Sequence, residues 1–263
     1  MINAVLIDVT KCQGCMSCVN ACVESKGGDR TRTAKGSASL SATQRSTVVV
    51  LDGGAQAKLG CMHCLEPSCA SACLVGAIEK RPDGPVTYDP DKCMGCRYCM
   101  LACPFHIPRY EWESTEPLMK KCDMCNDRIE KGETPLCVSA CPHDALEFGE
   151  RSALIDKAKK RIADHPGRYL DHVWGEKEWG GASMIYISPV SLEALGWPTP
   201  DIDTPISALT DPLIHATPVI GLSVLLGSWG LGAIIARRNK LMRRESGEES
   251  ATKPDKQENG DAE

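Results

Sequence analysis

The chain contains very few aromatic residues. Phe, Trp and Tyr make up 5% of its 263 residues, and only 2 residues are Phe. A large core built on aromatic side chains is therefore excluded. Cysteine, by contrast, occurs 16 times. Metal–thiolate bonds can supply the stability that aromatic burial does not, because site formation and folding then become one equilibrium.

The sequence also lacks a basic stripe and an export signal, and each absence excludes a class of function or location. The net charge is −5, and basic and acidic residues are both spread along the chain, without the basic stripe of a nucleic-acid surface. We therefore expect no nucleic-acid partner. Near the N-terminus the apolar run at 5–7 is cut by Asp8, and no twin-arginine pair is present. A secretory signal needs a longer apolar run, so we expect no export signal on this chain itself.

All cysteines lie between residues 12 and 141, in four groups of four with none left over. The groups are Cys12, Cys15, Cys18 and Cys22; Cys61, Cys64, Cys69 and Cys73; Cys93, Cys96, Cys99 and Cys103; and Cys122, Cys125, Cys137 and Cys141. The first and third have the spacing C-x2-C-x2-C-x3-C, whereas the middle gap is four residues in the second and eleven in the fourth. Such runs hold 4Fe–4S clusters in bacterial ferredoxins, where the fourth Cys ligates the other cluster.

The cysteine pattern has two alternative explanations. An even number of cysteines suits disulfides in a secreted protein. Here, however, three cysteines lie within seven residues in two separate places, which is unlike a disulfide framework. Structural zinc is the stronger alternative, although zinc sites typically join two separated CxxC pairs. Colour distinguishes them, since iron–sulfur proteins are brown and zinc proteins are colourless.

An internal repeat relates the groups. Residues 11–15 match residues 92–96, and the Ser-Ala-Cys at 71–73 and at 139–141 is followed at the same offset by Ala-Ile-Glu and Ala-Leu-Glu. Each unit is predicted to run strand, cluster loop, short helix, second loop, short helix, strand. We expect an α+β fold over residues 1–150, made of duplicated bacterial-ferredoxin-like domains with pseudo-two-fold symmetry.

Loop residues beside the cysteines have roles of their own. Gly14 and Gly95 lie inside cluster loops, where a positive φ and a close approach of backbone to sulfur need the missing Cβ. Lys11, Lys92 and Lys121 directly precede the first cysteine of three groups. Positive charge beside a cluster raises its reduction potential, so these lysines are either tuning residues or ordinary surface residues.

The cysteine motifs resemble those of a known family. The resemblance is carried by GCMHC at 60–64 with Pro67, by CMGCRYC at 93–99 with CPFHIPR at 103–109, and by residues 121–128 with Pro142. It continues through Gly175-Glu176, Gly180-Gly181, the MIY at 184–186 and a terminal apolar helix. The chain resembles the four-cluster iron–sulfur subunits of respiratory oxidoreductases. The nearest type is the beta subunit of membrane-bound formate dehydrogenase, and the alternative is the comparable subunit of uptake nickel–iron (NiFe) hydrogenase.

The resemblance implies four 4Fe–4S clusters, because every ligand position is Cys. It also implies that ligands are shared crosswise between the duplicated halves. The implied sets are Cys12, Cys15, Cys18 with Cys141; Cys122, Cys125, Cys137 with Cys22; Cys61, Cys64, Cys69 with Cys103; and Cys93, Cys96, Cys99 with Cys73. His63, His106 and His143 are expected to be loop residues and not ligands. Leu74 stands where the family often has Pro, which affects the expected helix geometry but not ligation.

The remaining segments are assigned more coarsely. Residues 27–47, rich in Ser, Thr, Gly and basic residues, are predicted to form a surface loop, and 150–165 has the pattern of an amphipathic helix. Residues 151–211 are expected to form an extension that contacts a partner subunit. Within it, His172, Trp174 and Trp179 are interpreted as contact residues, with redox relays as the alternative.

A membrane helix is predicted at 212–236. Residues 213–236 contain no Asp, Glu, Lys or Arg and would extend roughly 36 Å at about 1.5 Å per residue, enough for a hydrocarbon core of about 30 Å. Ser and Gly recur at four-residue spacing, which lets another helix approach closely. The alternative is a buried core helix. His215 is interpreted as an interface residue, and the polar tail at 237–263 is expected to be disordered in its acidic part.

These features predict an electron-transfer subunit without a substrate site of its own. It would connect a catalytic subunit (a molybdopterin enzyme such as formate dehydrogenase, or a nickel–iron hydrogenase) to an integral-membrane quinone or cytochrome b subunit. An enzyme with a labile cluster would need an incomplete cysteine set, and a zinc scaffold is the third reading.

The charges around the apolar helix predict its orientation. Arg237, Arg238, Lys240, Arg243 and Arg244 follow it directly. The charges before it are acidic, and no Lys or Arg lies between Lys177 and the helix. Basic residues favour the cytoplasmic side. We expect a single-pass protein of the inner membrane with a cytoplasmic C-terminus and a periplasmic cluster domain, exported with a partner that carries the twin-arginine signal.

Overall fold

The computed structural model of the chain describes residues 1–197 and 203–245. The chain divides into two units, Met1–Leu209 and Thr210–Glu263, which are considered separately. The first unit contains all sixteen cysteines, and the second contains most of the C-terminal helix. The end of the tail, expected to be disordered, lies outside the described residues.

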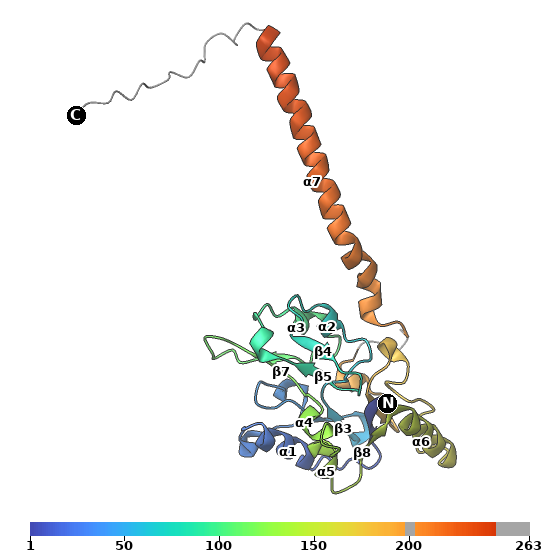
Figure 1. Cartoon of the computed structure of the whole chain (residues 1–263). Coiled ribbons are helices and arrows are strands. Elements are labelled where there is room, and N and C mark those ends of the chain that lie inside the picture. The colour runs from blue at the N-terminus through green and yellow to red at the C-terminus, as the bar shows by residue number, and fades with distance from the viewer. Residues whose placement is uncertain (198–202, 246–263) are drawn as a thin grey trace, which may run out of the picture. The chain divides into compact units, whose positions relative to one another are not determined.

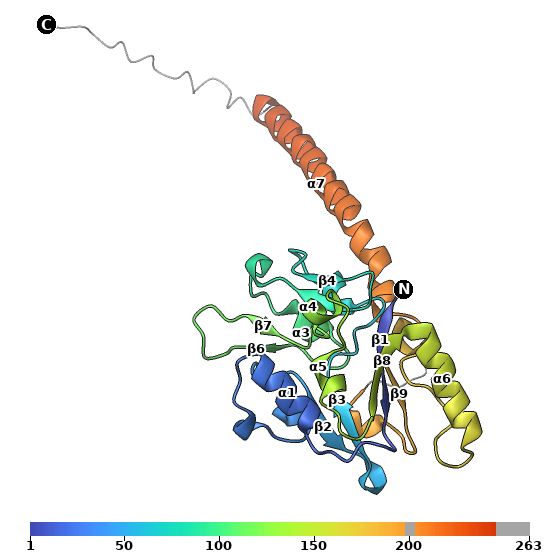
Figure 2. The same cartoon turned by 60° about the horizontal axis from the view of Figure 1, so that its bottom comes forward.

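A three-stranded sheet forms the base of the first unit. Its central strand β1 (Asn3–Asp8) pairs antiparallel with β8 (Leu146–Glu150) and parallel with β9 (Met184–Ile187). Figures 1 and 2 show helix α6 (Arg151–Asp164) on one side of this sheet and the short cysteine-bearing helices on the other. The sheet therefore separates a supporting helix from the cluster loops.

The alternation of side chains in β1 explains this arrangement. Ala4 and Leu6 pack with the buried apolar face of α6, whereas Val5 and Ile7 belong to the larger core cluster that includes the cysteine loops. Successive residues of a strand point to opposite faces, so a continuous apolar run is needed where both faces are covered. The predicted amphipathic helix at 150–165 is confirmed, with Leu154 among its buried residues.

The remaining strands form three short hairpins. They are β2 (Thr47–Val50) with β3 (Gln56–Leu59), β4 (Ile78–Lys80) with β5 (Val86–Tyr88), and β6 (Arg109–Tyr110) with β7 (Met119–Lys120). The short helices are α1 (Ser17–Ser25), α2 (Ser68–Ser71), α3 (Tyr98–Ala102), α4 (Asn126–Ile129) and α5 (Leu136–Ser139). The mixed helix and strand composition confirms the predicted α+β class.

The two sequence repeats interlock. The strand after the fourth cysteine group, β8, pairs with the strand before the first group, β1, and the strand after the second group, β4, pairs with the strand before the third, β5. In the same way α1 packs against α5, and α2 packs against α3. Each ferredoxin-like module is therefore built from one half of each repeat. The first and fourth groups form one module, and the second and third form the other.

Residues 151–211 are more closely joined to the cluster domain than the sequence indicated. Besides contributing β9, this segment donates backbone hydrogen bonds from Ser183 to His63 O (3.1 Å) and from Met184 to Met62 O (3.1 Å). Trp179 is buried and packs edge-on against Phe105, with ring centroids 4.9 Å apart. Contact of this segment with a partner subunit stays a prediction, but Trp174 and Trp179 are buried within the chain itself.

The segment at 27–47 runs mostly over the surface as two single 3-10 turns, at Arg30–Arg32 and Ser37–Ser39. The buried Gln44 anchors it, because its side-chain amide accepts from Ala34 N and donates to Ala34 O. Further 3-10 turns lie at Asp52–Gly54, Pro90–Lys92, Glu178–Gly180 and Glu193–Leu195.

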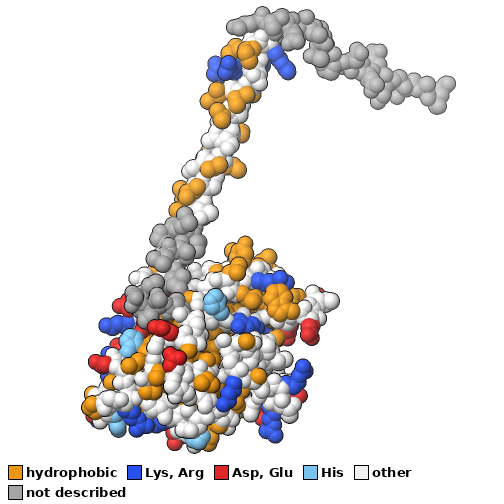
Figure 3. Space-filling view, turned by 180° about the vertical axis from the view of Figure 1, so that it is seen from behind, with side chains coloured by type: hydrophobic (Ala, Val, Ile, Leu, Met, Phe, Trp, Pro, Cys, Tyr) orange, Lys and Arg blue, Asp and Glu red, His pale blue; other side chains and the backbone are white. Residues whose placement is uncertain are grey.

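The C-terminal helix α7 (Ile206–Glu245) extends beyond the predicted 212–236 at both ends. Its stretch Ala216–Arg244 is long and apolar enough to cross a membrane, and none of its most apolar window is buried within the chain. Figure 3 shows hydrophobic side chains along this helix, with basic side chains near its C-terminal end. The alternative of a buried core helix is therefore not supported. His215 lies where the side chains are not described.

Candidate metal centres

All four cysteine loops share one backbone feature. The residue two positions after the first cysteine has a positive φ in each loop, namely 63° at Gly14, 49° at His63, 73° at Gly95 and 57° at Met124. The predicted left-handed conformation of Gly14 and Gly95 is confirmed. Its occurrence at His63 and Met124 was not predicted, and it costs about 1–3 kcal/mol at such residues. Backbone strain of this kind is typical of loops shaped around a functional group.

The fourth cysteine group reaches back to the first. The Cys12 site, defined as Cys12, Cys15, Cys18 and Cys141, lines one small cavity at the end of β1 and β8. Burial raises the pKa of the Cys12 thiol, and the neighbouring Cys141 and Cys15 raise it further, while a hydrogen bond from the backbone at Gly14 lowers it. Burial also raises the pKa of Cys18 to about 12. Thiols in this state must lose their protons when a metal binds.

The Cys122 site has the reciprocal composition. Cys122, Cys125, Cys137 and Cys22 together line a second cavity, in which three thiols come from the fourth group and one from the first. Burial is the largest cause of the raised pKa of Cys125, and the nearby Cys137 and Cys22 add to it. The first module thus brings together two sets of four thiols, each with three from one group and one from another.

The second module repeats the exchange. The Cys61 site consists of Cys61, Cys64, Cys69 and Cys103, and the Cys93 site of Cys93, Cys96, Cys99 and Cys73. Burial raises the pKa of Cys64, and the thiols of Cys61, Cys69 and Cys103 raise it further. Burial likewise raises the pKa of Cys99, to which Cys93, Cys96 and Cys73 contribute. Ligation by these sets stays a prediction, but the structure places each set together.

Backbone N–H groups point at several cysteine sulfurs. Ala77 N donates to Cys73 Sγ at 3.2 Å, and Ala145 N donates to Cys141 Sγ at 3.4 Å. These two bonds occupy equivalent positions in the two modules, as the matched sequence offsets predict. Hydrogen bonds to ligand sulfur raise the reduction potential of an iron–sulfur cluster.

The four sites follow one another in a row. Cys18 of the Cys12 site is a neighbour of Cys137 in the Cys122 site. Cys122 is a neighbour of Cys61, and Cys69 of the Cys61 site is a neighbour of Cys99 in the Cys93 site. The exposed cysteines are Cys15 and Cys96, which belong to the first and last sites of this row. The order is therefore Cys12, Cys122, Cys61, Cys93, with both ends at the surface.

The thiol geometry suits clusters better than single ions. A zinc ion needs four ligands converging at about 2.3 Å for sulfur. Among the described residues, which include every cysteine, no three Cys, His, Asp or Glu side chains converge in this way. A cubane instead takes one thiolate at each of four separate iron corners. Wider sets of four thiols on tight loops with inward N–H groups fit that requirement.

The surroundings of His63 are also consistent with a cluster at the Cys61 site. It is fully buried, so its interpretation as a surface loop residue is wrong. Its Nδ1 accepts a hydrogen bond from Val86 N at 2.9 Å, which leaves the proton on Nε2, and Nε2 has no partner among the described residues. Burial and the nearby Lys121, Lys80 and Lys58 hold its pKa well below the usual value. A neutral imidazole N–H beside Cys61 and Cys64 is thus free for a cluster sulfur.

Of the three lysines that precede cysteine groups, only Lys121 is buried. Lys11 lies 3.9 Å from Glu147, and Lys92 forms a surface ion pair with Asp89 at 3.2 Å. The sequence analysis missed two further lysines near the sites, Lys58 in β3 and Lys80 in β4. The signal for Lys58 was its position between apolar residues in a short strand.

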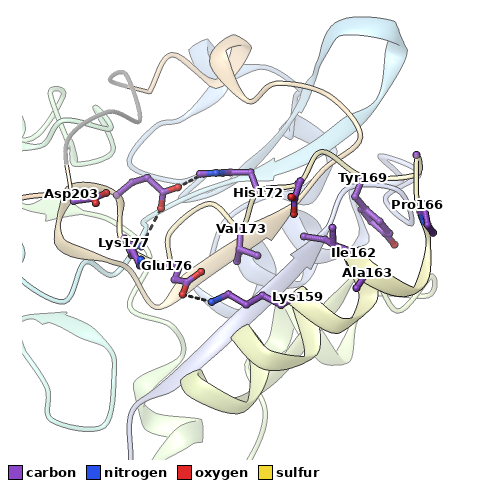
Figure 4. Close-up of a pocket in the computed structure, with 13 residues that line it drawn as sticks. Lys159, Ile162, Ala163, Pro166, Tyr169, His172, Val173, Glu176, Lys177 and Asp203 are labelled. Carbon is purple, nitrogen blue, oxygen red and sulfur yellow. Dashed lines mark hydrogen bonds and ion pairs between the residues drawn. The ribbon is translucent and has the colours of Figure 1, made fainter.

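A hollow on the surface lies away from the cysteine loops. It measures about 760 Å³ and lies between α6 and the loop that follows it (Figure 4). None of its lining residues is a cysteine, and two pairs of its polar side chains contact each other. Lys159 bonds Glu176 at 2.6 Å, and His172 bonds the buried Glu178.

Comparison with known proteins agrees with this geometry. A family model described as a 4Fe-4S dicluster domain matches residues 57–151. A protein of Nitratidesulfovibrio vulgaris is 40% identical over 262 residues, which cover 93% of this chain and 70% of that protein. The hydrogenase-2 operon protein HybA of Shigella flexneri is 33% identical and is covered over 87% of its length. The iron–sulfur subunit of the nitrate-inducible formate dehydrogenase of Escherichia coli is 34% identical, with 70% of this chain and 67% of that subunit covered.

The fold and the cysteine loops define a ferredoxin-type iron–sulfur protein. Since relatives above 30% identity are covered over two thirds of their length or more, the family is also defined. The chain belongs to the iron–sulfur electron-transfer subunits of respiratory oxidoreductases.

Proposed function

We propose that this chain carries four 4Fe–4S clusters, one at each of the four sites, and relays single electrons along them. The observation that carries the proposal is the unbroken row of sites with an exposed cysteine at each end. Electron tunnelling slows steeply with distance. Four clusters in a row divide the path between two surfaces into short steps, which a single cluster does not. Each transfer removes one electron from one cubane and adds it to the next, without a substrate site on this chain.

The two ends of the row differ in surface chemistry. Around the Cys93 site the side chains of Leu74, Met94, Tyr98, Leu101 and Trp112 are at least half exposed. Figure 3 shows hydrophobic side chains gathered at an edge of the domain. Clustered exposed apolar residues mark interaction sites. At the Cys12 end, by contrast, Cys15 lies beside the hydroxyl of Ser17.

This difference supports a direction for the relay. The apolar end at the Cys93 site fits an integral-membrane subunit that handles quinone, and the polar end at the Cys12 site fits a water-soluble catalytic subunit. Helix α7 would anchor the chain in the inner membrane beside that membrane subunit. The relatives named for formate dehydrogenase and for the hydrogenase-2 operon support two kinds of catalytic partner, a molybdopterin enzyme or, alternatively, a nickel–iron hydrogenase.

Metal analysis of the native complex tests the proposed partner. The chain is expected to co-purify from membranes with a larger catalytic subunit, because the exposed Cys15 end requires an electron donor. Molybdenum or tungsten in the complex indicates a pterin enzyme, and nickel indicates a hydrogenase. Recovery of the chain without any second redox subunit from gently solubilised membranes would contradict the relay.

A further inference from the structure

Lys58 is a buried cation without an acidic partner. Its exposed fraction is 3%, and it lies in β3 between Ala57 and Leu59, which are buried as well. Across the described parts of the chain, no carboxylate lies within ion-pair distance of its Nζ and no protein oxygen accepts a hydrogen bond from it. Burial of an unpaired ammonium is costly and normally drives off its proton. A lysine kept at such a position implies an anion beside it.

The groups that face Lys58 are cysteine thiols of two different sites, and these thiols become anions when a metal binds. Lys58 lines the cavity of the Cys12 site and also that of the Cys122 site. Lys58 therefore lies between the first two sites of the row, with the thiols of one site on one side and those of the other site on the other.

The other two lysines near the sites, the half-buried Lys80 and the buried Lys121, are held differently. The ammonium of Lys80 donates to His63 O at 3.1 Å and to Gly84 O at 2.6 Å. That of Lys121 donates to Cys122 O at 3.0 Å and to Val86 O. Both ammonium groups therefore have backbone carbonyl acceptors. The backbone of Lys58 is itself fixed, because the Tyr186 hydroxyl donates to Lys58 O at 3.0 Å. The position of Lys58 is thus fixed through its backbone, and its ammonium remains available to interact with the two sites.

We propose that Lys58 is the electrostatic link between the clusters of the Cys12 and Cys122 sites and raises the reduction potential of both. The inference rests on the proposed assignment of one cluster to each site. A cubane held by four thiolates is an anion, and reduction adds one more negative charge. A fixed cation therefore favours the reduced form, as nearby positive charge does in iron–sulfur proteins. Because Lys58 faces both sites, it also offsets the repulsion that an electron on one cluster exerts on the other. The ammonium keeps its proton while one electron leaves one cubane and enters its neighbour.

The test is potentiometric titration of the purified full-length protein, followed by electron paramagnetic resonance. Lys58→Met removes the charge and keeps the length of the side chain. Two of the four clusters are expected to become harder to reduce. Their equilibrium constants for reduction should fall about tenfold, which corresponds to a reduction potential lower by about 59 mV for a one-electron couple. The other two are expected to keep their potentials, and iron content should equal that of the unaltered protein.

Two further variants complete the test. Lys35→Met removes an exposed lysine that also acts on Cys12, bonded through Nζ to Gln56 Oε1 at 2.9 Å. Solvent screens its charge, so the change in each equilibrium constant should stay under about twofold. Lys58→Arg keeps the charge and should restore both potentials.

The possible outcomes separate clearly. If Lys58→Met loses the clusters of two sites while Lys58→Arg keeps them, the charge requirement is supported. Unchanged potentials, equal shifts of all four clusters, or loss of clusters in both Lys58 variants would overturn the proposal, because shape and not charge would then matter. A low iron count in the unaltered protein would instead contradict the cluster assignment.

Discussion

A fragment that ends at Asp91 should hold no stable cubane, although it contains the first two cysteine groups complete. In the structure, Cys141 lies with the first group and Cys103 with the second, and both are absent from the fragment. Strand β1 also loses both of its partners, β8 and β9. Loss of a ligand at each site removes the metal–thiolate bonds on which folding depends. The expected result is a colourless, protease-sensitive fragment with near-background iron.

A matched fragment of residues 1–205 serves as the control. It lacks α7 but keeps every cysteine and all three strands of the sheet, so it should be soluble and keep the visible absorbance of the full chain. Iron and sulfide are measured in both fragments after anaerobic purification. Two stable cubanes in the shorter fragment would show that clusters are not shared between the repeats.

Much of this architecture could be predicted from the sequence because cysteine spacing constrains the backbone directly. The left-handed Gly14 and Gly95, the α+β class and the apolar C-terminal helix were all predicted and are confirmed. The pairing of β4 with β5 was not predicted, because three-residue strands show no usable periodicity. The matched offsets after Cys73 and Cys141 indicated a repeat but not which strands pair.

The missed features share a physical cause. Strand β9 carries the MIY motif, but only the fold shows that it pairs with β1, some 180 residues earlier in the chain. Lys58 is a charged residue in a strand, and charged residues are normally exposed. His63 occupies the position that glycine holds in two other loops, and sequence spacing does not report burial. Each of these features depends on long-range packing around the cysteine loops.

Protease added to intact spheroplasts should digest the cluster domain and spare the C-terminal tail. Five basic residues, Arg237, Arg238, Lys240, Arg243 and Arg244, follow the apolar stretch of α7 and favour a cytoplasmic end. Residues 178–212 contain no Lys or Arg. Antibodies against epitopes at the two ends of the chain detect the result. The epitope in the cluster domain should be lost completely, and the epitope in the C-terminal tail should be retained completely.

Two controls sharpen this experiment. Lysed spheroplasts should lose both epitopes, and deletion of the export signal of the partner subunit should leave the cluster domain protected inside the cell. Protection of the cluster domain together with digestion of the tail in intact spheroplasts would reverse the assigned orientation.

The iron and sulfide content of the anaerobically purified chain tests the central claim most directly. Four cubanes predict about 16 iron and about 16 sulfide per chain, with broad visible absorbance that bleaches on reduction. About 12 of each would mean that one of the four sites holds no cubane. Stoichiometric zinc without sulfide, in a colourless protein, would contradict the relay altogether.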